Sequence, residues 1–211
     1  MNFFVDALSL FMQTSAQMGT HILLATLGGI LCEKAGNMNL GIEGMMLLGA
    51  SVGFSAALAT GNPALAVLAA GLAGACGAFL YAAITVTLRG NQVVTGLVLT
   101  IFGTGVSGFI GQGLSGKALP AQVSSAFAPV SIPVLRDIPV LGKMIFEQSV
   151  YVHLALLVAI VMFAYFRHTR AGLNVRAVGE NPGAADASGI NVNAYKSVSY
   201  THLACLLYTS R

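Results

Sequence analysis

The sequence predicts an all-α fold, a polytopic transmembrane helical bundle with about five spans. Of its 211 residues, 56% are hydrophobic and only 8% are charged, and the mean hydropathy is +0.80. Soluble domains carry about 25% charged residues, so this chain cannot cover a globule with a water-facing surface. Apolar runs of the roughly 18 residues needed to cross a bilayer recur along the chain.

The apolar runs give each predicted span in turn. The first ends near Cys32 and starts between Ala7 and Met18, because polar residues dilute its front half. The second closes at the Gly61-Asn62-Pro63 turn, a sequence typical of a break between helices. A polar connection over residues 112–148 holds four of the six prolines. The last four spans are predicted at Leu40–Ala59, Ala64–Leu88, Val93–Gly111 and Ser149–Phe166.

The positions of Lys and Arg predict the orientation. Six of these residues fall on the side of the basic segment Arg167–Lys196, against three on the other side. Cytoplasmic loops carry the excess of positive charge, so this segment and the turn Gly36–Asn39 are expected in the cytoplasm, with the N-terminus outside. The only early charge is Asp6, which argues against a cleaved signal peptide.

Several motifs resemble catalytic or binding signatures but lack the context that these need. Residues Gly111–Ala118 nearly match a phosphate-binding loop, yet they lack the final hydroxyl and follow an apolar helix. The four histidines show no metal-ligand spacing, and no Ser–His–acid or paired-carboxylate pattern is present. The cations lie at span ends and form no single patch. We therefore expect no enzyme, cofactor, metal site or nucleic-acid partner.

Small residues recur at helix-contact spacing in the second and third spans. Ala66, Ala70, Gly74 and Ala78 form one stripe, and Gly49 and Gly53 form a G-x-x-x-G pair. Such residues let helix backbones approach closely in lipid. We expect static packing here, and helices that slide during transport are the alternative.

A glycine-rich polar turn, Glu33–Met46, joins the first two spans. Lipid cannot satisfy polar backbone, so this turn must be buried in protein or hydrated. Asn39 is expected to cap the second helix, and Glu43 to lie in its first turn, where the helix dipole favours an anion. The alternative is a role in lining or gating a solute path. Candidates for that role are Asn37, Asn39, Glu43 and, at the start of the fourth span, Asn91 and Gln92.

The basic segment after the fifth span is expected to be a loop that ends in a short capped helix. Asn181 is a suitable N-cap, Pro182 a suitable first residue and Gly189 a suitable stop. The small side chains of Ala184 and Ala185 leave a helix of about two turns that can enter a cleft on a cytoplasmic partner. The alternative is an ordinary amphipathic surface helix.

Three segments, Ala35–Ala50, Asn91–Gly103 and Thr169–Asn193, together resemble the inner-membrane permease of ATP-binding-cassette importers. The most similar group takes up simple sugars and nucleosides and is related to branched-chain amino-acid permeases. The resemblance implies a multi-pass protein of the bacterial inner membrane that translocates its solute by alternating access. Nucleoside is the first expectation and simple sugar the second.

The resemblance also implies partners. They are cytoplasmic ATPase subunits that hydrolyse ATP, a second permease subunit and an extracytoplasmic solute-binding protein. The two permease subunits form a homodimer or a heterodimer. Membrane lipid surrounds them. The segment that would couple to the ATPase comprises Glu180, Asn181, Pro182, Ala184, Ala185, Gly189 and Ile190.

Two further expectations complete the interpretation. Residues 1–196 form a partial permease domain, since the family continues with further spans, whereas residues 197–211 do not match it and resemble a non-native tail. The rival function is an ion-coupled secondary transporter. That rival predicts acid pairs within the membrane, and only Glu43 fits it.

Overall fold

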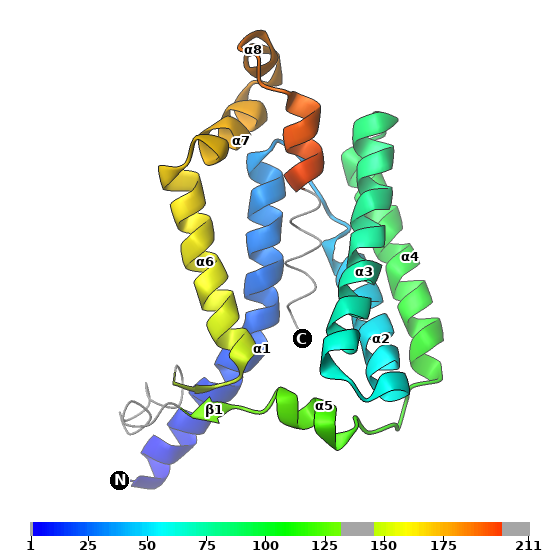
Figure 1. Ribbon diagram of the computed structural model, residues 1–211, viewed down its shortest axis with the longest axis vertical. Helices are drawn as coiled ribbons and strands as arrows, with labels where there is room; N and C mark the ends of the chain where they lie inside the picture. The colour runs from blue at the N-terminus through cyan, green and yellow to red at the C-terminus, as the bar shows by residue number, and fades with distance from the viewer. Residues whose placement is uncertain (1, 132–145, 200–211) are drawn as a thin grey trace.

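A computed structural model describes residues 2–131 and 146–199 and is built mainly of helices (Figure 1). Five of its helices are long and apolar enough to cross a membrane, which confirms the predicted class and number of spans. They are α1 (Asn2–Lys34), α2 (Ile42–Thr60), α3 (Pro63–Ala82), which continues as the π-helical turn η1 (Ala83–Thr87), α4 (Gln92–Gln112) and α6 (Val150–His168).

The expected start of the first span was wrong, because α1 is helical from Asn2. Its polar front half does not break the helix. The hydroxyls of Ser9, Thr14 and Thr20 each donate to the backbone carbonyl four residues earlier, at 2.6 to 2.9 Å. A hydroxyl paired in this way can lie in an apolar helix without an unsatisfied donor.

The prediction of a basic loop before Asn181 was also wrong, because residues Arg170–Glu180 form a helix, α7. Thr169 caps it by accepting a hydrogen bond of 3.0 Å from the amide of Gly172. Val175 and Val178 are buried three residues apart, while the basic side chain of Arg176 stays exposed. This apolar stripe of one helical face was hidden among the charges that dominate the segment.

Short elements complete the described chain. The polar connection contains α5 (Ala121–Ala126) and two strands, β1 (Val130–Ser131) and β2 (Glu147–Gln148), which pair antiparallel. After α7 comes α8 (Pro182–Ala187), and residues 192–199 are again helical. The thiol of Cys32 on α1 lies 3.7 Å from the carbonyl of Ser199, so this last helix lies beside the end of α1.

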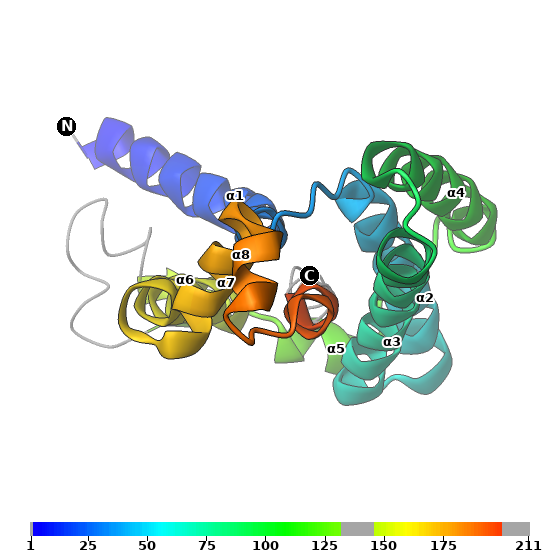
Figure 2. The ribbon, with the colours of Figure 1, turned by 90° about the horizontal axis from the view of Figure 1, so that it is seen from above.

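The long helices form two units. α1 packs against α6 and α7, whereas α2 packs against α3 and α4. Figure 1 and, from above, Figure 2 show these units side by side, with α8 at one end and α5 at the other. The turn at residues 35–41 joins the units at the α8 end. The polar connection joins them at the opposite end.

Small residues bring α2 and α3 together, as predicted. Ala66, Ala70 and Ala78 are buried. A methyl group placed on Gly49 would lie 3.2 Å from the carbonyl oxygen of Ala70, and one on Gly53 would lie 2.8 Å from the Ala70 Cβ. The G-x-x-x-G pair therefore packs on the alanine stripe, as the static-packing interpretation expects.

A tighter contact, which sequence reasoning missed, joins α2 to α4. A methyl group on Gly44 would lie 2.5 Å from the carbonyl oxygen of Leu99, and one on Gly103 would overlap the backbone of Gly44. Gly103 belongs to a G-x-G-x-x-G run inside the fourth span, and helix packing accounts for this first glycine, whereas a methyl on Gly105 or Gly108 meets nothing within 4 Å. Beside this contact lies the main core cluster, Cys32, Met45, Ala78, Tyr81 and Leu99.

We predict that Gly103→Ala destabilises the bundle by about 1–3 kcal/mol, because the added methyl would force α2 and α4 apart. Gly105→Ala is the matched control, since it lies on the same helix and a methyl there meets nothing within 4 Å. Helix propensity alone favours alanine at both positions by up to about 1 kcal/mol. Thermal unfolding of the two variants in detergent should separate them, and equal midpoints would contradict the close contact.

Candidate functional site

The candidate site begins with the turn between α1 and α2, residues 35–41. Its two asparagines are almost fully buried, with exposed fractions of 1% for Asn37 and 8% for Asn39. Gly36 has φ +76°, a left-handed conformation that glycine adopts without strain. The turn thus buries its two asparagines, while the side chains of Met38 and Leu40 are exposed.

Tyr81 and Gln92 fasten this turn to the other helices. The Tyr81 hydroxyl lies 2.6 Å from the carbonyl oxygen of Met38 and 3.2 Å from that of Gln92. The Gln92 side chain accepts a 2.9 Å bond from the amide of Met38 and donates, at 3.4 Å, to Asn37 Oδ1. A tyrosine at the end of α3 and a glutamine at the start of α4 therefore satisfy backbone groups of the turn.

Thr100 adds a third attachment, about two turns further along α4 than Gln92. Its hydroxyl lies 2.8 Å from the carbonyl oxygen of Leu40 and 3.2 Å from that of Gly96 in its own helix. Gly96 makes room for this approach, because a methyl there would lie 2.8 Å from the amide nitrogen of Leu40. The end of the turn is held against the α4 backbone.

The helix-capping role predicted for Asn39 was wrong, whereas the predicted position of Glu43 is confirmed. Asn39 does not cap α2: its Oδ1 accepts a 2.8 Å bond from the Gly41 amide within the turn, and Gly41 occupies the N-cap position without a side-chain bond. The extra residues of the turn place Asn39 too early to reach the first amides of the helix. Glu43 lies in the first turn of α2, as predicted, and its side chain is exposed.

Asn91 has backbone partners, whereas Asn37 and Asn39 each keep one amide group without a partner among the described residues. Asn91 caps α4 by accepting bonds of 3.0 and 3.1 Å from the amides of Val93 and Val94. The Nδ2 groups of Asn37 and Asn39 are buried without a hydrogen-bond partner among the described residues. Buried amides normally find partners, so these two groups mark a place where the turn has unused donors.

The segment after α7 has the predicted caps. Asn181 accepts a 3.0 Å bond from the amide of Ala184, Pro182 is the first residue of α8, and Gly189 has φ +81°. The Ile190 amide donates to the carbonyl of Ala185 at 3.0 Å and closes the helix end. Sequence reasoning therefore placed this helix correctly.

One side chain of α8 faces the wrong way for the role expected of it. Ala184, Ala187 and Ser188 are exposed, but Ala185 has an exposed fraction of only 4%. Ala185 packs within the protein, so it is not available to a partner. The error arose because a helix of small residues shows no polar face from which its buried side could be predicted.

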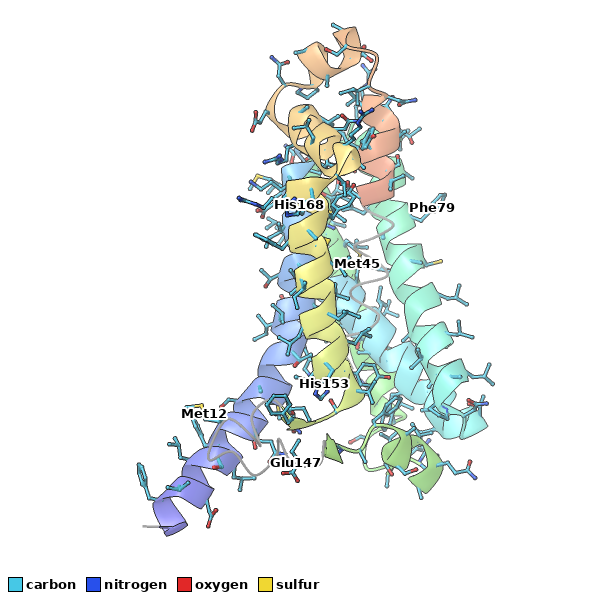
Figure 3. The ribbon with its side chains drawn as sticks, turned by 60° about the vertical axis from the view of Figure 1, so that its left-hand side comes forward. Met12, Met45, Phe79, Glu147, His153 and His168 are labelled. Atoms are coloured by element: carbon cyan, nitrogen blue, oxygen red, sulfur yellow. The ribbon has the colours of Figure 1, made fainter. Side chains whose placement is uncertain are left out.

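The turn and the α7–α8 segment touch at two glycines. A methyl on Gly36 would lie 3.1 Å from the Cα of Gly179, and one on Gly179 would lie 3.0 Å from the Gly36 amide nitrogen, closer still to the carbonyl oxygen of Lys34. This contact confirms that the two segments lie at the same end of the bundle. Figure 3 shows that end of α6 at His168 and the opposite end at His153.

Sequence reasoning missed the attachments made by Tyr81, Thr100 and Gly179. A usable signal existed for Tyr81, since a buried tyrosine hydroxyl usually finds a partner and this tyrosine interrupts an apolar span. Thr100 and Gly179 carried none, because their partners come from distant parts of the chain.

Comparison with known proteins identifies relatives over most of the chain. The family described as the permease component of the branched-chain amino acid transport system matches residues 11–206. The predicted boundary at Lys196 stays a prediction. Residues 192–199 form one helix across it, and residues 200–211 of the expected tail lie outside the described residues. No solved structure matches the chain significantly.

Three relatives are similar over most of the chain. The guanosine ABC transporter permease of Bacillus subtilis is 35% identical over 89% of this chain and 61% of its own length. The putative glucose ABC transporter permease of Haloferax volcanii is 36% identical over 88% and 56%, respectively. The nucleoside ABC transporter permease of Lactococcus lactis is 35% identical over 91% and 62%. The chain thus spans somewhat more than half the length of these relatives.

The Thr100 attachment gives a prediction with a built-in control. Thr100→Val should lower the free energy of unfolding by about 0.5–1.5 kcal/mol, because the Leu40 carbonyl loses a donor. Thr104→Val removes the same hydroxyl one helical turn later, where it donates to the carbonyl of Thr100 within its own helix. Unfolding curves of both variants test this, and equal losses would show that the bond to the turn contributes nothing.

Proposed function

The chain belongs to the family of branched-chain amino acid transport system permease components, and we propose that it is the membrane-spanning part of an ATP-driven importer for a nucleoside or a simple sugar. The supporting observation is the match to named nucleoside, guanosine and glucose transporter permeases at 35–36% identity. Transport by alternating access moves the solute without changing it chemically. The family is a transporter component and not an enzyme.

Family membership and five apolar spans identify a multi-pass membrane protein, of the inner membrane in a bacterium. Permeases of this class work with ATPase and solute-binding partners. We extend this to specific partners here: cytoplasmic ATPase subunits, a second permease subunit and an extracytoplasmic binding protein. The ion-coupled alternative has no support beyond the exposed carboxylate of Glu43, and the relatives' names favour the ATP-driven mechanism.

The proposed ATPase contact is the tip formed by Glu180–Ile190. Its exposed side chains at Ala184, Ala187 and Ser188 are small, and Glu180 and Asp186 each add a negative charge. A rigid helix with small side chains fits a narrow cleft without a large loss of side-chain entropy. Asn181, Pro182 and Gly189 serve this tip by fixing its two ends.

The proposed route of coupling runs from that tip to the α2–α4 unit. α8 packs on α7, α7 meets the turn at Gly179 and Gly36, and the turn is bonded to Tyr81 and Gln92. Each step is a direct contact between named atoms, so a displacement of the tip can reach α3 and α4. Direct participation of Asn37, Asn39, Glu43, Asn91 or Gln92 in a solute path stays a prediction.

The ATPase contact can be tested in the full-length permease co-expressed with its ATPase. Ala184→Arg should abolish both co-purification of the ATPase and uptake of labelled guanosine or glucose, because a long cation cannot enter a cleft that fits alanine. Ala184→Ser, which keeps the side chain small, is the control and should behave as wild type. Unchanged uptake by the arginine variant would show that the tip does not contact the ATPase.

A test of the coupling route requires a variant that still binds the ATPase. Gly179→Ala should reduce uptake at least several-fold while the ATPase still co-purifies, because its methyl would push α7 off the turn by an overpacked contact costing about 1–3 kcal/mol. Gly19→Ala adds a methyl where nothing lies within 4 Å and controls for the substitution itself. Uptake equal to that of the control would show that coupling does not pass through this contact.

A further inference from the structure

A cavity of about 390 Å³ lies between the two helix units, toward the end opposite the turn and α8. It is bounded by α1, by the halves of α2 and α3 nearest the Gly61–Pro63 break, by the polar connection and by the start of α6. Its volume falls in the range of about 300–1,000 Å³ typical of small-molecule sites. Sites of this kind are common between packed helices, where two units meet.

The lining combines aromatic rings with the polar groups of His21 and Tyr151. Phe54, Phe127 and Tyr151 contribute rings from α2, the connection and α6, and Gly53 with nearby alanines leaves the wall on the α2–α3 side smooth. None of the lining residues of this cavity is Asp, Glu, Lys or Arg. A cavity without a fixed charge favours a neutral ligand, and aromatic walls favour one with a flat or apolar face.

His21 contributes a polar ring from α1. Its Nδ1 atom is buried and has no hydrogen-bond partner among the described residues. Because Nδ1 has almost no accessible surface, the His21 ring must turn toward the cavity before this nitrogen can donate or accept, according to its tautomer, with a hydroxyl, an amide or a ring nitrogen of a ligand. A buried polar atom without a partner is costly, and a ligand that pairs with it removes that cost.

Phe127 connects the cavity to both units. Its ring packs on the buried cluster of Ala57, Ala66 and Val123, which belongs to the α2–α3 side. On the other side its centroid lies 5.1 Å from that of Tyr151, at the start of α6. A relative movement of the two units would therefore change the shape of this cavity.

We infer that this cavity, with His21 and the Phe127–Tyr151 pair, is a contact site for the transported solute, a neutral polyhydroxylated molecule with a flat or apolar face. The inference rests on the proposed function. Nucleosides and simple sugars share this chemistry, since both carry ring hydroxyls. A lipid acyl chain is the competing occupant, but it offers no partner for His21.

The test is direct binding to the full-length permease in nanodiscs, without the binding protein, using radiolabelled guanosine and, separately, radiolabelled glucose. His21→Leu should weaken binding of the bound probe about tenfold, because the ligand loses its hydrogen bond in a buried place. His21→Gln keeps a group that donates and accepts, and it should restore most of the affinity. Phe127→Trp narrows the cavity without removing apolar surface and should weaken binding as well.

Met162→Ala is the matched control, because Met162 lies on α6 but lines a different cavity, beside α7. Binding that is equal in wild type, His21→Leu and Phe127→Trp would overturn the inference, as would a change only in co-purified lipid. Uptake by the assembled transporter separates failure of this site from failure of the proposed function. Wild type that takes up neither probe refutes the proposed function, whereas normal uptake by the cavity variants refutes only this site.

Discussion

The structure depends on how one short polar turn satisfies its backbone at the edge of a membrane bundle. Residues 35–41 leave amides and carbonyls that lipid cannot pair. Tyr81, Gln92 and Thr100 supply the partners, from two helices that follow in the chain. The same bonds that complete the turn therefore fix where α3 ends and where α4 begins relative to α2.

Close glycine contacts complement these bonds within the α2–α4 unit. In lipid no hydrophobic force drives helices together, so they associate by packing and by hydrogen bonds. Gly44 and Gly103 let α2 and α4 meet at backbone distance, and Gly53 does the same for α2 against α3. The α2–α4 unit thus has both kinds of attachment.

The fold was predictable from composition and periodicity because long apolar spans leave few alternatives. Five spans, the Asn181 cap and the Gly49–Gly53 contact all follow from local sequence. The helix at Arg170–Glu180 did not, since its charges conceal a stripe as narrow as Val175 and Val178. Nor could the pairing of Gly36 with Gly179 be foreseen, because it joins residues that are distant in sequence and carry no side chains to signal contact.

The two kinds of contact at the turn differ in what they permit. On its α3–α4 side the turn is held by directional hydrogen bonds, so it can move only together with those helices or by breaking the bonds. On its α7 side it meets Gly179 through van der Waals contact alone among the described interactions, and such a contact transmits a push but not a pull. A push on the tip at α8 would then move the turn and the α2–α4 unit as one body. The cavity at His21 lies between that body and the unit of α1 and α6, so the same displacement would alter it from the opposite end of the bundle.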